Sequence, residues 1–217
     1  MNSVFAKVPE VKQELIMTIC IEEFAKNGYD NASTDIITSR AGISKGILFH
    51  YFKSKKNLYL AVVKHCTRLL IDRTMEEVDR IQAVDFFDRL KAIILAKQQI
   101  TLRHSQEAEL VQRAMIHPPK ALKEELDAFF SEHQTKYTDP FMLNDLFKTD
   151  LLASGPLREG VTPEKVFHMV MMVLSQYSAK YLQLYRTGDY THEALQAMLI
   201  EESDDFIDMV KYGVYRK

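Results

Sequence analysis

Basic side chains are concentrated in one stretch of the N-terminal third of the sequence. Between Ile36 and Ile71 there are seven Lys and Arg residues and no Asp or Glu. They are Arg40, Lys45, Lys53, Lys55, Lys56, Lys64 and Arg68. Residues 1–71 carry a formal charge of +4 and residues 72–217 one of −6. A cationic block on an otherwise acidic chain favours contact with a polyanion such as nucleic acid. The alternative is a solvated helix face, which normally mixes both signs of charge.

The sequence lacks the patterns that are typical of catalysis or metal binding. Cys20 and Cys66 lie 46 positions apart and form no CxxC pair. His65 and Cys66 are neighbours, so on a helix they point in different directions. There is no glycine-rich phosphate loop, no HExxH motif and no locally supported Ser-His-Asp arrangement. We therefore expect no enzyme activity, no metal site and no cofactor.

Composition predicts a soluble, helical, cytoplasmic protein. The 217 residues are 47% hydrophobic and include only seven Gly and six Pro, too few for the frequent turns of an all-β fold. The N-terminal residues contain no apolar signal-peptide core. The longest uncharged stretch in the second half has 14 residues, 166–179, whereas a membrane span needs about 20. Two isolated cysteines fit a reducing compartment.

Hydrophobic periodicity predicts helices along the whole chain. The expected ranges are 10–27, 34–41, 45–51, 55–81, 86–117, 119–137, 140–152, 163–185 and 191–215. Gly28 is expected to end the first helix, and Ser33, Ser44 and Ser54 to cap the next three. Two short helices joined by a turn at Gly42 and braced by a longer helix form a helix-turn-helix unit. We expect this domain at residues 1–54 and an all-helical second domain at 55–217.

Residues 24–62 resemble the N-terminal domain of TetR-type (TetR/AcrR-like) bacterial transcriptional regulators. The shared residues are Phe24-Ala25, Gly28-Tyr29, Ser33, Ile37, Ala41 to Gly46, Leu48, Tyr51-Phe52, Ser54-Lys55 and Leu58. The resemblance implies an all-α fold, with a three-helix helix-turn-helix DNA-binding domain followed by a helical domain for ligand binding and dimerisation. It also implies that the helix at 45–51 enters the major groove of double-stranded operator DNA.

The resemblance implies a role on DNA for particular residues. Lys45 would reach guanine, Ile47 a thymine methyl group, and Lys55 a phosphate beside a helix N-terminus. His50 has a solvated surface histidine as its alternative. The expected DNA-binding residues are Ser33, Thr34, Ser44, Lys45, Gly46, Ile47, His50, Tyr51 and Lys55.

Met, aromatic and Gln residues in the second domain suggest an effector pocket between the long helix and the segments at 86–152. The pocket candidates are Phe86, Gln98, His104, Met115, Phe129, Phe130, Met142, Phe147, Met171 and Gln176. A helix at 163–187 that is apolar on two faces suggests a second layer, supplied by a homodimer. The interface candidates are Val166, Val170, Val173, Tyr177, Tyr181, Leu195, Leu199 and Phe206.

The sequence thus predicts a homodimeric, ligand-responsive transcriptional regulator, most simply a repressor that a small molecule releases from its operator. Two alternatives stay open. One is a helical protein–protein adaptor whose helix-turn-helix unit does not contact DNA. The other is an all-α enzyme that modifies a small molecule.

Overall fold

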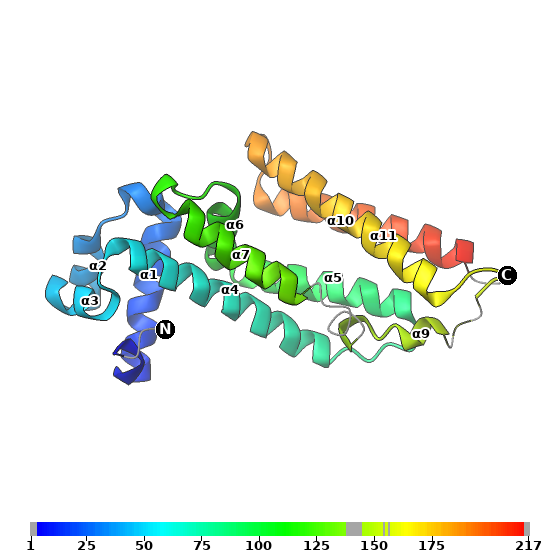
Figure 1. The fold of residues 1–217 in the computed structure, drawn as a ribbon, viewed down its shortest axis with the longest axis horizontal. Helices are drawn as coiled ribbons and strands as arrows, with labels where there is room; N and C mark the ends of the chain where they lie inside the picture. Colours follow the sequence, from blue (N-terminus) through cyan, green and yellow to red (C-terminus); the bar gives the residue numbers. More distant parts are fainter. Residues whose placement is uncertain (1–3, 138–144, 154, 156, 215–217) are drawn as a thin grey trace. The chain divides into compact units, whose positions relative to one another are not determined.

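The computed structural model describes residues 4–137, 145–153, 155 and 157–214, and within this part it contains helices and no β-strand (Figure 1). Two 3-10 turns, η1 and η2, span Phe5–Lys7 and Lys120–Leu122. The helices of the first half are α1 (Glu10–Asn31), α2 (Thr34–Ala41), α3 (Lys45–Phe52), α4 (Lys55–Asp79) and α5 (Phe86–Arg103). Those of the second half are α6 (Ser105–Ile116), α7 (Lys123–Tyr137), α9 (Asp150–Ala153), α10 (Pro163–Thr187) and α11 (His192–Val214). The expected all-α class is confirmed.

The helices pack as two compact units. One contains residues 1–72 and 104–131, and the other contains residues 73–103 and 132–217. The long helix α4 therefore begins in the first unit and ends in the second. The expected boundary between the DNA-binding domain and the second domain, at residue 54, stays a prediction. In the packing of the structure, the start of α4 belongs with α1 to α3.

The first unit is built around fully buried side chains from each of its helices. Ile16, Ile37 and Leu48 are completely buried, one each from α1, α2 and α3. The ring of Phe24 meets the edge of the Tyr59 ring at 5.0 Å between centroids. Each such side chain contributes roughly 1.5–3 kcal/mol by leaving water, so this core holds the two short helices on α1 and α4.

Capping and one left-handed residue shape the turn between α2 and α3. The hydroxyl oxygens of Ser33 and Ser44 accept hydrogen bonds from the amides of Ile36 and Ile47, at 3.4 and 3.2 Å. Gly42 has φ 61° and ψ 35°, a conformation that costs little only for glycine. Ser54 caps α4 through the amide of Asn57, at 3.1 Å. These expectations from the sequence are confirmed.

Gly28 interrupts the helix with the positive φ expected from the sequence. It has φ 68° and ψ 179°, and one short helical turn follows it to Asn31, so the glycine makes a kink between the two parts of α1. The guanidinium of Arg113 donates to the carbonyl of Ala25 at 3.1 Å and lies 3.9 Å from where a Gly28 Cβ would stand. A side chain from α6 thus supports the backbone carbonyl that the kink leaves free.

The expected single helix at 86–117 is two helices. His104 has φ −118° and ψ 49° and separates α5 from α6. The units also change at this point, because α5 packs in the second unit and α6 in the first. No Gly or Pro marks the break, since packing and not local propensity produces it. Of the helix expected at 140–152, the described part contains α9 at Asp150–Ala153, and residues 138–144 lie outside the described residues.

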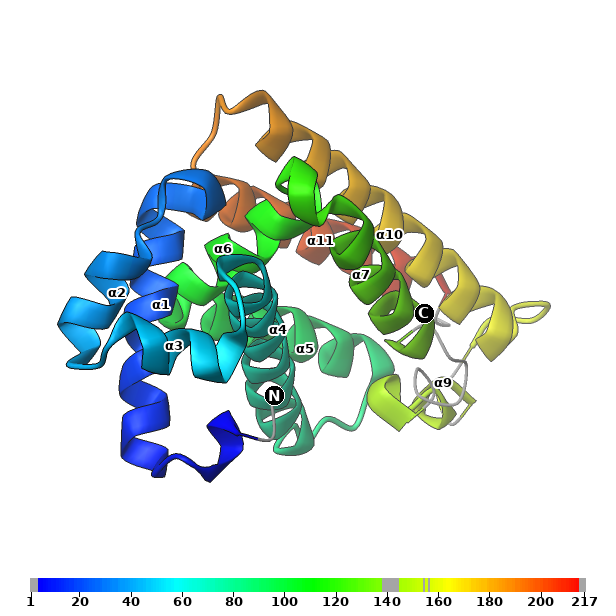
Figure 2. The same cartoon turned by 60° about the vertical axis from the view of Figure 1, so that its left-hand side comes forward.

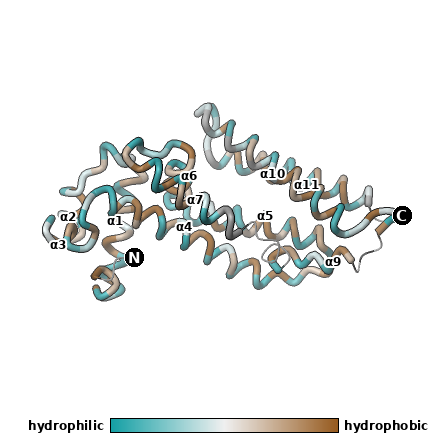
Figure 3. The backbone as a smooth tube through the Cα atoms, viewed as in Figure 1, coloured by the Kyte–Doolittle hydropathy of each residue, from teal (hydrophilic) through white to brown (hydrophobic). Residues whose placement is uncertain are grey.

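The second unit has its own apolar core. Phe86, Leu90, Val170 and Ile207 are buried there, contributed by α5, α10 and α11. Helices α10 and α11 run side by side in opposite directions in both cartoon views (Figures 1 and 2). The hydropathy colouring alternates along both helices, as expected for helices with one buried face (Figure 3).

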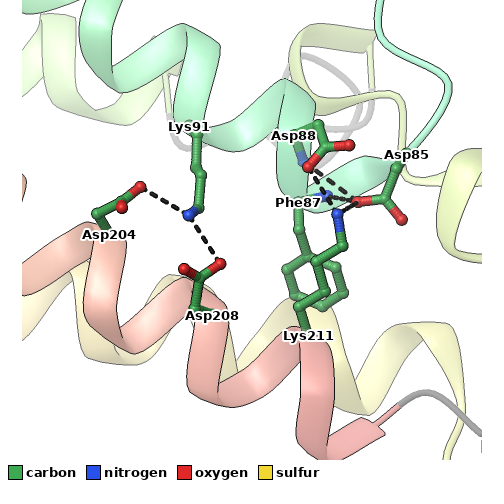
Figure 4. Close-up of polar contacts among 7 residues, drawn as sticks. All are labelled: Asp85, Phe87, Asp88, Lys91, Asp204, Asp208 and Lys211. Atoms are coloured by element: carbon green, nitrogen blue, oxygen red, sulfur yellow. Dashed lines mark hydrogen bonds and ion pairs between the residues drawn. The ribbon is translucent and has the colours of Figure 1, made fainter. Parts of the chain in front are cut away.

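Reciprocal ion pairs join α5 to α11 at the edge of this core (Figure 4). Lys91 lies 2.7 Å from both Asp204 and Asp208, which stand one turn apart on α11. Lys211 makes the opposite pairing, at 2.6 Å from Asp88 and 3.3 Å from Asp85. The start of α5 is therefore paired with the end of α11, so the two helices are antiparallel.

Candidate nucleic-acid interface and ligand cavity

Helix α3 presents a mixed polar and apolar surface to solvent. Lys45, Gly46, Ile47 and His50 are exposed, whereas Leu48 is fully buried in the first unit. Ile47 is 40% exposed, so its apolar side chain is available for contact on this surface. An exposed helix of this length with a basic residue in its first turn has the form of a major-groove recognition helix.

Lys45 forms an ion pair on this surface. Its Nζ lies 2.9 Å from Oδ1 of Asp35, in the first turn of α2, and the two side chains are 52% and 72% exposed. The Asp35 carboxylate thereby places a negative charge beside the residue expected to meet DNA. This pairing was not predictable from the acid-free stretch, because Asp35 lies just outside it.

Ser33, Thr34 and Ser44 stand at helix N-termini. The Ser33 and Ser44 hydroxyls cap α2 and α3, and Thr34 is the first residue of α2. The backbone amide of Ser33 donates to Glu23 Oε1 at 2.8 Å. The start of α2 is therefore held from α1.

Two expected DNA-binding residues are held inside the first unit. Lys55 Nζ donates to the carbonyl oxygen of Asp30 at 3.0 Å and lies 5.1 Å from the centre of the Tyr29 ring. Tyr51 is half-buried, with its ring 5.5 Å from that of Phe5. These contacts tie the start of α4 and the end of α3 to α1 and η1, a positioning role that the sequence did not reveal.

Much of the cationic block is neutralised by carboxylates from outside it. Arg40 pairs with Glu22 at 2.5 Å and Lys56 with Glu125 at 2.6 Å. The Lys64 ammonium lies 5.2 Å from the centre of the Phe129 ring. These pairings reduce the net positive charge of this region, in which Arg40, Lys45 and Lys53 are exposed.

Family comparison decides what kind of protein carries this surface. The profile described as bacterial regulatory proteins of the tetR family matches residues 17–62. The profile described as the tetracyclin repressor-like C-terminal domain matches residues 84–214, more than half of the chain. The chain belongs to the TetR family. It is a transcriptional regulator with a helix-turn-helix DNA-binding domain, and the resemblance drawn from residues 24–62 is confirmed.

Characterised TetR-family relatives match to different extents. The fatty acid metabolism regulator protein of Bacillus subtilis strain 168 is 29% identical over 202 residues, which are 93% of this chain and 95% of that protein. The transcriptional activator FasR of Mycolicibacterium smegmatis is 33% identical over 90 residues, 42% of this chain and 40% of the relative. The match to UidR of Escherichia coli K12, at 26% identity, spans 49% of this chain and about half of that regulator, 53%.

Solved structures share the fold at low sequence identity. A TetR-like transcriptional regulator from Rhodococcus sp. RHA1 superposes with a TM-score of 0.58 at 16% identity, covering 91% of this chain and 96% of that one. A TetR family regulator from Chloroflexus aurantiacus J-10-FL gives 0.50 at 20% identity, covering 100% and 99%. At this identity the likeness supports the fold alone.

A cavity of about 300 Å³ lies within the second unit of this TetR-family chain. Its walls come from α5, α10 and α11 together with Phe147. The apolar side chains include Ile93, Leu174 and Leu199, and Lys97 is the charged one among the described lining residues. The volume is at the small end of the range for small-molecule sites. The cavity thus differs from the expected position between the long helix and residues 86–152, because α10 and α11 supply much of its wall.

Three expected pocket residues line this cavity, namely Gln98, Phe147 and Met171. The others are placed elsewhere. Phe86 is fully buried in the core and Gln176 is exposed. His104, Met115, Phe129 and Phe130 belong to the first unit, and Met142 lies outside the described residues. The aromatic and Met residues of the second domain correctly indicated an apolar interior. Composition alone cannot tell which of these residues pack in the core and which line a cavity.

Four of the expected dimer residues form internal core instead of a free surface. Val166, Val170, Tyr181 and Leu195 are between 0 and 5% exposed. Val173 is half-buried, the rings of Tyr177 and Phe206 contact each other at 6.1 Å, and Leu199 lines the cavity. The four buried residues therefore leave no free surface for a partner, and for them the expectation is wrong. The interface role of the four half-buried residues stays a prediction.

Different residues of α10 and α11 are exposed. Met172, Met209 and Tyr212 are 53%, 68% and 73% exposed, and Met169 and Met198 are each 36% exposed. Met198 and Met209 belong to the apolar stripe of the last helix that the sequence suggests for a dimer interface, and periodicity alone cannot tell which residues of such a stripe pack inside. Exposed methionines on neighbouring helices are typical of a surface that a partner covers.

Neither cysteine is placed for chemistry. Cys20 and Cys66 are both fully buried, and burial raises the pKa of each thiol to about 12. Among the described residues, no group of three or more His, Cys, Asp or Glu side chains is arranged to hold a metal ion. No helix in the described part is long and apolar enough to cross a membrane.

Proposed function

We propose that this TetR-family regulator is a repressor that binds operator DNA as a homodimer and is released when a small molecule occupies the cavity of the second unit. The observation that carries the proposal is the exposed face of α3, with Lys45, Ile47 and His50 presented to solvent by a capped helix. A lysine at this position donates to guanine O6 and N7, and an isoleucine packs against a thymine methyl group.

A homodimer would place two copies of α3 on one face of DNA. Half-sites one helical turn apart, about 34–36 Å, or a near multiple, suit two recognition helices related by a two-fold axis. We assign the interface to the exposed face of α10 and α11 that includes Met169, Met172 and Met198, in place of the buried valine stripe.

The cavity supports the effector part of the proposal. It lies against α5, which continues across His104 into α6, and α6 packs in the unit that carries α3. A ligand shifts DNA affinity only if it binds one conformation of the dimer better than the other. The Bacillus subtilis relative, matched over nearly its whole length, is named a fatty acid metabolism regulator, which favours lipid metabolism as the regulated process.

Selection of bound duplexes from a random pool tests the proposal directly. We expect a two-fold symmetric site whose affinity falls steeply with salt, because bound phosphates displace counterions. Lys45→Ala should weaken that site by about 1–3 kcal/mol per half-site and relax preference at one base pair. Lys123→Ala, an exposed lysine on α7, is the matched control. An adaptor would select no sequence, and an enzyme would turn over the molecule that it binds.

A further inference from the structure

The charged side chain of the cavity in the second unit lies toward one of its ends. The ion pairs of Lys91 and Lys211 show that α5 and α11 are antiparallel, so Gln196 near the start of α11 stands opposite the last turns of α5. Lys97, Gln98 and Thr101 occupy those last turns and line the same cavity. These four polar side chains therefore lie toward the same end.

The other end of the cavity is mainly apolar, and Ser203 of α11, next to the Asp204 that pairs with Lys91, is a polar side chain there. Leu90 and Ile93 line it from the earlier turns of α5. Met171 of α10 stands near Leu90, because Phe167, one turn before it, contacts Phe86 with ring centroids 6.2 Å apart. Leu90 and Lys97 are separated by seven residues of helix, so a ligand lying along α5 between them has an apolar portion of about 10 Å.

Lys97 is a cation without a counter-charge. The described residues provide no ion pair to its ammonium, and no Asp or Glu is found among the described lining residues. The other α5 lysine, Lys91, has two aspartates as partners. Lys97 is an exposed residue at the edge of the cavity, and partial desolvation of its ammonium group against the wall lowers its pKa. An anion bound there would contact an ammonium group that has no competing carboxylate among the described lining residues.

We propose that the cavity binds an apolar monocarboxylate, with the carboxylate on the Lys97 ammonium and the apolar portion against Leu90, Ile93 and Met171. This inference rests on the proposed effector function and specifies the chemical class of the effector. The 300 Å³ volume restricts the ligand to one compact apolar group. A flexible aliphatic acid and a rigid alkyl-substituted aromatic acid share this chemistry.

Titration calorimetry on the full chain without DNA tests the proposal with a charge series of one hydrocarbon. Decanoate, decanol and decylamine have the same tail and differ in the head group, and 4-butylbenzoate tests the rigid acid. Decanoate, 4-butylbenzoate or both should bind, and each acid that binds should do so more tightly than decanol and decylamine. Binding of only one of the two acids identifies which form of apolar portion the cavity takes. Lys97→Met should weaken acid binding about tenfold or more and bring it close to that of decanol.

Charge reversal keeps the proposal falsifiable if the methionine variant folds poorly. Lys97→Glu should prefer decylamine to decanoate, whereas the control Lys165→Met, an exposed lysine of α10 away from the cavity, should leave all affinities unchanged. Binding of no probe, equal binding of decanoate and decanol, or an acid preference that survives in Lys97→Met would each overturn the proposal. A separate titration of the same acids against the DNA complex distinguishes the two proposals. Lys97-dependent binding that leaves DNA affinity unchanged supports the ligand class and refutes release from DNA.

Discussion

The ammonium of Lys45 and the carboxylate of Asp35 lie 2.9 Å apart, so the recognition lysine of α3 is paired with the first turn of α2 before DNA arrives. Both side chains are more than half exposed, and such pairs are worth about 0–1 kcal/mol. DNA therefore has to displace a weak partner, and the Asp35 carboxylate repels the phosphates that approach it.

Asp35→Asn should raise DNA affinity for all sequences, since it removes a repelling charge and releases Lys45. The gain should be larger at low salt than at high salt, because it is electrostatic. Fluorescence anisotropy with operator and scrambled duplexes over a salt series measures it. Asp127→Asn, an exposed aspartate on α7, serves as the control. A loss of affinity confined to operator DNA would mean that Asp35 itself contacts a base.

Lys55→Ala should lower the free energy of unfolding by about 1 kcal/mol. It removes the hydrogen bond to the Asp30 carbonyl and the cation–π contact with Tyr29. Thermal and urea denaturation measure the change, with Lys53→Ala as the exposed comparison. The expected contact of Lys55 with a DNA phosphate stays a prediction. It is tested by the slope of log DNA affinity against log salt concentration for the same variant. Unchanged stability would show that Lys55 is free to meet DNA.

Substitutions on the two faces of α10 should separate folding from dimerisation. Val170 is completely buried, so Val170→Glu should unfold the second unit, at a cost of several kcal/mol. Met172 is 53% exposed, so Met172→Glu together with Met198→Glu should give helical monomers. Analytical ultracentrifugation measures the oligomeric state of each variant, and circular dichroism measures its helix content. If the methionine variants stay dimeric, the interface lies elsewhere.

The Lys91 pair should show in the pH dependence of stability. Burial alone would lower the pKa of Lys91, and the hydrogen bonds and charges of Asp204 and Asp208 outweigh it, so the pKa is raised above 10.5. A raised pKa means that this stabilisation is present below pH 10.5 and is lost as pH rises through the folded-state value. Lys91→Met should lower the free energy of unfolding at pH 7 by roughly 1 kcal/mol and flatten its decline above pH 10.5. If the free energy of unfolding falls equally above pH 10.5 in the wild-type protein and in the variant, the ion pairs of Lys91 do not stabilise the fold.

Cys20 and Cys66 should be unreactive in the folded protein. Both are fully buried with thiol pKa values raised to about 12, so the reactive thiolate is scarce at pH 8. A chromogenic disulfide reagent should detect neither in native protein and both after addition of guanidinium chloride. Rapid labelling without denaturant would show that the first unit opens locally.

The helix-turn-helix unit was predictable from the sequence because its signals are local. Serine caps, the Gly42 turn and the 3.6-residue periodicity act within one or two turns of chain, so α2, α3 and α4 begin or end within two residues of the expected positions. Family membership followed from the same local pattern of residues.

Tertiary packing decided the rest, since it depends on residues far apart in the chain. Lys45 and Lys55 were both expected to contact DNA, yet one is exposed beside Asp35 and the other contacts Asp30 and Tyr29. Val170 was expected to face a second subunit, and it is buried in the core of the second unit instead. Lys97 gives no signal in the sequence, because a lysine on a helix is ordinarily solvated. Only the convergence of α5, α10 and α11 places it on a cavity wall where the described lining residues include no carboxylate.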